Sequence, residues 1–87
     1  MPVVMLRAPL KDRAGKVGEH DLPGATVSEV LRELERRYPP VKGWILDEQG
    51  QVRAHVNVFV NGERTRGDTQ VGGTDVLQVL PSIAGGS

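Results

Sequence analysis

The sequence predicts an α+β fold in which a mixed sheet of four to five strands packs on one α-helix. Two observations carry this prediction. Thr26 to Tyr38 is an amphipathic segment of helical period, and short apolar runs lie on both sides of it. One of these runs, His55 to Val60, alternates valine with other residues, as a strand with one buried face does. A chain of 87 residues forms one such domain, whose core leaves little room for a deep catalytic cavity.

The first predicted elements form a hairpin. Val3 to Leu6 is an apolar run near the N-terminus that we interpret as a strand. A polar stretch with Gly15 at its turn follows, and Lys16 to Leu22 is predicted to return as an antiparallel second strand.

The helix has clear start and stop signals. Thr26 can cap it, because its hydroxyl accepts from a backbone N–H of the first turn while Glu29 reaches back to the cap, as in a capping box. Pro39 and Pro40 end it, because proline disfavours helical geometry in the preceding residue. Its predicted apolar face consists of Val27, Val30, Leu31, Leu34 and Tyr38.

The second half of the chain is predicted to supply the remaining strands. After an irregular segment, 41–54, comes the strand His55 to Val60. Asn61 and Gly62 favour a type I′ turn, so Glu63 to Arg66 should return as a short partner. Val76 to Leu80 is a final apolar strand.

That last strand is too apolar for a sheet edge, so we place it in the middle, beside the first strand. The result is a β-grasp domain over residues 1–81, followed by a flexible C-terminal Gly-Gly tail over 82–87. Trp44 is expected to plug one end of the core with its two following neighbours. The predicted core includes Val4, Leu6, Leu31, Leu34, Val56, Val58 and Val79.

Composition excludes several functions. Basic and acidic residues balance at 11 each, so the footprint of a nucleic-acid binder is missing. No apolar stretch approaches the roughly 20 residues that span a membrane, and no signal peptide is recognisable, so we expect a cytoplasmic protein. The chain has no cysteine, and its two histidines lie on different segments, so no metal site is predicted. The carboxylates are scattered, which argues against an independent enzyme.

A family resemblance enters at the C-terminus. Residues 80–86 read L-P-S-I-A-G-G, and residues 56–62 read V-N-V-F-V-N-G. Together with the capped helix, these motifs resemble the ubiquitin-like sulfur-carrier family of MoaD, ThiS and CysO. The long segment between helix and hairpin is similar to the MoaD and CysO type.

The resemblance implies a protein cosubstrate that binds no cofactor of its own. A MoeB-like or ThiF-like enzyme would use ATP to adenylate the carboxylate of Gly86, and sulfide or a persulfide would displace AMP to leave a thiocarboxylate. That sulfur would pass to an acceptor enzyme that makes a sulfur-containing metabolite. Gly85 and Gly86 lack the Cβ atoms that would obstruct a narrow partner channel. The residues expected to contact the partner are Phe59, Leu80, Pro81, Ile83 and Ala84.

Ser87 departs from the pattern, because it holds the Gly86 carboxylate in a peptide bond. Either a protease, such as the JAMM zinc type, removes it, or it is an added residue. In either case we expect the 87-residue form to accept no sulfur.

Several alternatives remain open at this stage. The same activated glycine would serve a ubiquitin-like modifier that is attached to lysines, and a plain β-grasp interaction domain would use no tail chemistry. Phe59 is either a docking anchor or a residue packed under a loop. Arg7, Arg64 and Arg66 are interpreted as solvated rather than as contacts to an acidic partner surface. We expect a monomer in isolation.

Overall fold

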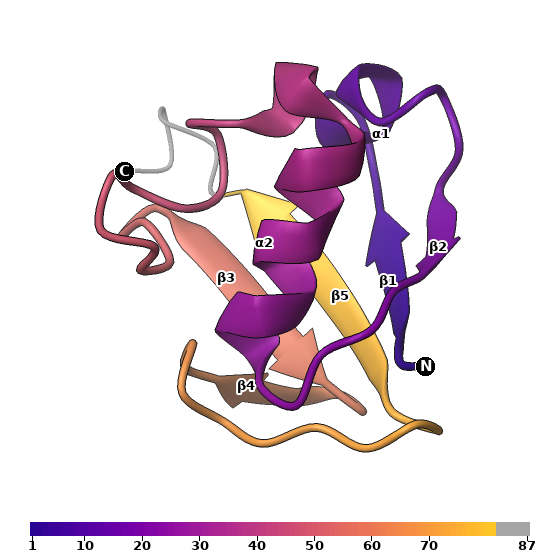
Figure 1. The fold of residues 1–87 in the computed structure, drawn as a ribbon, viewed down its shortest axis with the longest axis vertical. Coiled ribbons are helices and arrows are strands. Elements are labelled where there is room, and N and C mark those ends of the chain that lie inside the picture. The colour runs from indigo at the N-terminus through magenta and orange to yellow at the C-terminus, as the bar shows by residue number, and fades with distance from the viewer. Residues whose placement is uncertain (82–87) are drawn as a thin grey trace.

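The computed structural model describes residues 1–81, which form a five-stranded mixed sheet with helices on one side (Figure 1). The strand order is β2-β1-β5-β3-β4, with β5 central, parallel to β1 and antiparallel to β3. This arrangement confirms the predicted β-grasp, including the central place of the last strand. The elements are β1 (Val3–Leu6), α1 (Leu10–Arg13), β2 (Glu19–Asp21), α2 (Val27–Arg37), the 3₁₀ turn η1 (Pro39–Val41), β3 (Val56–Val60), β4 (Glu63–Thr65) and β5 (Val76–Pro81).

The N-terminal hairpin differs from the prediction. Its second strand, β2, has only three residues, and the polar stretch before it contains the short helix α1. Leu10 and Ala14 are both buried in the core, so this stretch carries an apolar pair at helical spacing. Gly15 and Lys16 then take positive φ angles of 72° and 63°, which turn the chain and delay the strand.

Helix α2 begins and ends as predicted. Thr26 Oγ1 accepts a hydrogen bond from the backbone N–H of Glu29 at 3.2 Å. The Glu29 carboxylate accepts from the N–H of Ala25 at 3.0 Å, one residue before the expected N–H of Thr26. The helix is therefore capped at both positions that precede it. The side chains it buries against the sheet are Val27, Val30, Leu31 and Leu34.

Gly24 packs closely against the first turns of α2. A Cβ atom there would lie 2.6 Å from Cγ2 and 2.7 Å from the backbone N of Val30, and the φ angle is +154°. We expect Gly24→Ala to lower the free energy of unfolding by about 2–4 kcal/mol, because backbone as well as side chain must shift. Gly43 is a matched control, since it has φ +88° with nothing within 4 Å of its Cβ position. Gly43→Ala should cost about 1 kcal/mol from its φ angle alone. Denaturant titration measures both, and equal losses would contradict the close packing.

The core contains all seven predicted residues, each of them buried. The prediction for Trp44 is wrong, because this side chain is 43% exposed. The guanidinium of Arg13 lies over its ring, 3.9 Å from the centroid, and Ile45 and Leu46 fill the core in its place. A stacked arginine stabilises an aromatic ring that remains partly in water.

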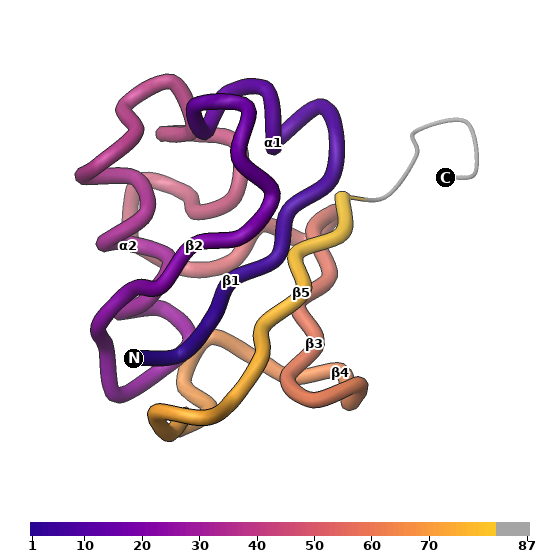
Figure 2. The backbone as a smooth tube through the Cα atoms, turned by 90° about the vertical axis from the view of Figure 1, so that its right-hand side faces the viewer, coloured from indigo at the N-terminus to yellow at the C-terminus, as the bar shows by residue number. Residues whose placement is uncertain are grey.

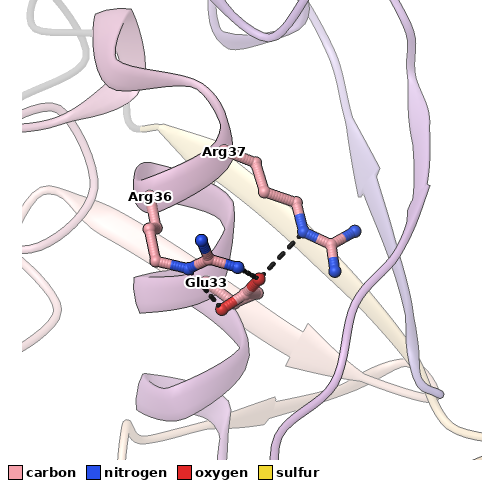
Figure 3. A network of polar contacts seen from close by, with 3 residues as sticks. All are labelled: Glu33, Arg36 and Arg37. Carbon is pink, nitrogen blue, oxygen red and sulfur yellow. Dashed lines mark hydrogen bonds and ion pairs between the residues drawn. The ribbon is translucent and has the colours of Figure 1, made fainter.

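The outer side of α2 carries a network of charged residues (Figure 3). Arg36 donates to both carboxylate oxygens of Glu33, and Arg37 donates from Nε to Oε2 at 2.9 Å. These hydrogen bonds lower the pKa of Glu33 from 4.5 to about 2, and the one from Arg36 has the larger effect. A carboxyl group with a lowered pKa in the folded state favours folding above its ordinary pKa. The contribution is lost as the pH falls from about 4.5 to about 2.

This network gives a pH prediction that NMR can check. In a titration of the folded protein, the Glu33 carboxyl should have a pKa of about 2. Replacing both Arg36 and Arg37 with glutamine should raise that pKa toward its ordinary value, because the donors are gone. Arg64→Gln, on β4, is the control and should leave the pKa of Glu33 unchanged. An unchanged pKa in the double variant would show that the arginines do not hold this carboxylate in solution.

Candidate functional site

Strand β5 leads to the base of the C-terminal segment. It pairs with β1 on one side and with β3 on the other, and its last residue, Pro81, lies opposite Val56. Leu77 and Val79 are fully buried beneath α2. Figure 2 shows β5 between β1 and β3, with its last residues at the end of the described chain. Strand β5 is held on both edges as far as Val79, and pairing with Val56 on β3 then fixes the position of Pro81.

The predicted site residues fall into two groups, those within the described residues and those beyond Pro81. Leu80 and Pro81 are described and half-buried. Ile83, Ala84, Gly85, Gly86 and Ser87 lie outside the described residues, so their predicted roles stay predictions.

The face of the sheet opposite α2, which we call the open face, carries a small apolar cluster. Phe59 and Met5 lie on either side of Gln78 in the strand register, and Leu80 is two residues farther along β5. Alternation along each strand places all of them on the open face. Phe59 is half-buried, and Met5 is 39% exposed. In Figure 2, α1 and α2 lie on the other side of the sheet, so no described helix covers this cluster.

The hairpin turn is tied to the start of β5. Asn61 and Gly62 have φ angles of 51° and 88°, as the predicted type I′ turn requires. Asp75 accepts from the Asn61 amide at 2.9 Å and from the N–H of Gly72 at 2.8 Å. The Asn61 side chain in turn accepts from the N–H of Val76 at 3.0 Å. The N–H of Gly72 and the Asn61 amide lower the pKa of Asp75. These contacts fix where β5 begins, a role that the sequence motif alone does not show.

The two histidines, His20 and His55, lie in different environments. His20 is buried, lies 2.7 Å from the carbonyl oxygen of Val17 through Nε2, and meets the Tyr38 ring edge-on with 5.0 Å between the centroids. His55 is exposed. Within residues 1–81, no three His, Cys, Asp or Glu side chains gather as metal ligands would. No helix in that same range is long and apolar enough to cross a membrane.

Comparison with known families decides the assignment. The family model described as the ThiS family matches residues 4–86. The chain belongs to the ThiS family. Its resemblance to the MoaD, ThiS and CysO carriers is thereby confirmed, and the match ends on Gly86, with Ser87 outside it.

Individual relatives support both the family and the fold. Small archaeal modifier protein 3 of Haloferax volcanii is 42% identical over 66 residues, which cover 71% of either chain. A chain of the Amycolatopsis orientalis BexX/CysO complex superposes with a TM-score of 0.87 at 26% identity, covering 97% of this chain and 98% of that one. Small archaeal modifier protein 1 of Methanosarcina acetivorans gives 0.84 at 28% identity, with coverages of 95% and 93%. The chain is thus similar to a protein crystallised in a BexX/CysO complex and to proteins named as modifiers.

Proposed function

We propose that this chain is a sulfur carrier, a protein cosubstrate that works through the carboxyl carbon of Gly86. The observation that carries the proposal is the family match, which extends through the Gly-Gly pair and ends there. The β-grasp domain supports it, because the central strand β5 delivers the chain to the tail from a fixed point. Gly86 is the fifth residue after Pro81, so the reach is at most about 18 Å.

The proposed chemistry has two steps, and partner enzymes catalyse both. A carboxylate oxygen of Gly86 attacks the α-phosphorus of ATP, and pyrophosphate leaves. The sulfur of hydrosulfide then attacks the acyl carbon, the bond to AMP breaks, and the proton passes to solvent. The absence of cysteine supports this role, because no internal thiol competes for the activated acyl group.

The proposed partners follow from these steps. A MoeB-like or ThiF-like enzyme supplies ATP-dependent activation, and an acceptor enzyme takes the sulfur for a sulfur-containing metabolite. A JAMM-type metalloprotease is proposed to remove Ser87 first. We further propose a cytoplasmic, monomeric carrier that binds no cofactor. The open-face cluster of Met5, Phe59 and Leu80 offers an apolar docking surface for the activating enzyme.

A second function is favoured by one specific relative. Small archaeal modifier protein 3, at 42% identity, is named as a modifier. A modifier begins with the same adenylate, but the amine of a lysine on a target protein attacks the acyl carbon, the bond to AMP breaks, a proton passes to solvent, and an isopeptide bond forms. One chain can serve both functions, because the two reactions differ only in the nucleophile that attacks the acyl carbon.

Intact mass of the protein from its native cell tests these functions. Loss of Ser87 together with exchange of one oxygen for sulfur would establish a processed carrier. Conjugates that resist reducing agent and contain an isopeptide at Gly86 would establish the modifier. A chain that keeps Ser87 and gains neither, in cells that contain an activating enzyme, would overturn both and leave an interaction domain.

A further inference from the structure

A groove of about 1020 Å³ is lined by residues of α2, of the segment before β3 and of the β3–β4 hairpin. Its outstanding feature is four arginines from four separate parts of the chain. Arg32 lies on α2, Arg53 lies in the segment before β3, and Arg64 lies on β4. Arg66 directly follows β4. We call this feature the arginine groove.

The residues that line the arginine groove carry a net positive charge. Four of the 11 basic residues line it, with only two of the 11 acidic ones, Glu29 and Asp68. Glu29 already accepts from the backbone N–H of Ala25 at the start of α2. The lining thus carries a formal charge of +2, from four positive and two negative residues, on a chain with a net charge of zero.

Within the described residues, 1–81, the guanidinium groups of the groove have no carboxylate partner. Among residues 1–81, the ion pairs are those of Glu33 with Arg36 and Arg37, both outside the groove lining. Nε of Arg53 is shielded from solvent and donates to no atom of the described residues. The other two arginines of α2, Arg36 and Arg37, are paired with Glu33, which is outside the groove lining.

The walls of the groove are held in place by backbone contacts. The carbonyl oxygen of Gly67 accepts from the N–H of Ser28 at 2.9 Å, which joins the end of the hairpin to α2. Outside the groove lining, a Cβ atom at Gly50 would lie 2.1 Å from Nη2 of Arg32, so the guanidinium packs against a bare backbone. Asp47 fixes that backbone by accepting from the N–H groups of Gln49 and Gln51, each at 2.9 Å. Arg32 therefore has a prepared position.

We propose that the arginine groove binds an acidic, extended segment of a partner protein. Guanidinium groups pair with carboxylates through two parallel hydrogen bonds, and four arginines line the groove. It is bordered by β4, the edge strand of the sheet, along which an extended segment can lie. Nucleic acid fits less well, because the lining contains no aromatic residue on which a base could stack. The inference does not rest on chemistry at Gly86.

The test is a titration of the ¹⁵N-labelled full chain with a synthetic peptide of about ten residues that alternates glutamate with serine, so that one face of an extended strand is acidic. We expect amide shifts at Arg32, at Arg53 and in 64–68. Binding should weaken as salt rises, because the charges are partly exposed. A peptide with glutamine in place of glutamate should cause none of these shifts.

A matched pair of variants makes the test specific. Reversing Arg32 and Arg66 to glutamate should weaken binding at least about tenfold, since attraction becomes repulsion. Reversing the exposed Lys11 and Lys16 to glutamate changes the net charge by the same amount and should leave the affinity unchanged. The amide spectrum outside the groove checks that both variants fold. Shifts that miss the groove, equal losses in the two variants, or tighter binding of an oligothymidylate of equal charge would each overturn the proposal.

Discussion

A chain that ends at Gly86 is expected to take up one sulfur atom, whereas the 87-residue chain takes up none. Adenylation requires a free carboxylate oxygen to attack phosphorus, and the bond to Ser87 leaves only an amide at that carbon. The difference is one of chemistry rather than of binding, so a large excess of activating enzyme should not remove it. Incubation with that enzyme, ATP and sulfide, followed by intact mass, measures the result.

A chain that ends at Gly85 completes this comparison. It presents a glycine carboxylate as well, but its reach from Pro81 is shorter by about 3.3–3.6 Å. A misplacement of about 1 Å can cost a hundredfold in rate, so we expect charging at least about a hundredfold slower than for the chain ending at Gly86. All three chains should unfold at the same temperature, because residues 1–81 are unchanged. A thiocarboxylate on the intact 87-residue chain would contradict the requirement for a free Gly86.

The parts of the fold that the sequence predicts correctly depend on local signals. The capping residue Thr26 and the apolar spacing of α2 lie within one segment, as does the turn at Asn61 and Gly62. The central place of β5 follows from its apolar sequence, since a strand at the edge of a sheet is rarely so apolar. These features needed no knowledge of distant contacts.

The parts that were missed depend on contacts between distant residues. The predicted burial of Trp44 is wrong: its ring stays partly exposed under a guanidinium from α1, and composition does not reveal that partner. Helix α1 has only four residues and no side-chain cap, so it lacks the usual signals. The arginine groove brings together four arginines from widely separated positions, and the sequence alone favours a solvated role for two of them, Arg64 and Arg66. The Gly-Gly site is different, because its chemistry follows from residue type and not from surrounding packing.

Changing Phe59 to alanine is expected to weaken binding to the activating enzyme by about tenfold or more, which corresponds to about 1.4 kcal/mol. Phe59 lies on the open face beside Gln78, with Met5 and Leu80 nearby, and it is half-buried. An aromatic side chain in such a cluster gains burial when a partner covers it. The free energy of unfolding should fall by less than about 2 kcal/mol, because much of the ring is not enclosed by the core.

Trp44→Ala separates this effect from the general loss of an aromatic side chain. Trp44 is also partly exposed, but it lies on the helical side of the molecule, under the guanidinium of Arg13. This variant should bind the activating enzyme as the unchanged chain does. Isothermal titration gives the affinities and denaturant titration gives the stabilities. If Phe59→Ala instead lost several kcal/mol of stability with its affinity intact, the ring would be a packing residue, and docking would have to use another face. If the affinity falls while the stability holds, the open face is the docking surface, and the fixed position of Pro81 explains how the tail is presented from it.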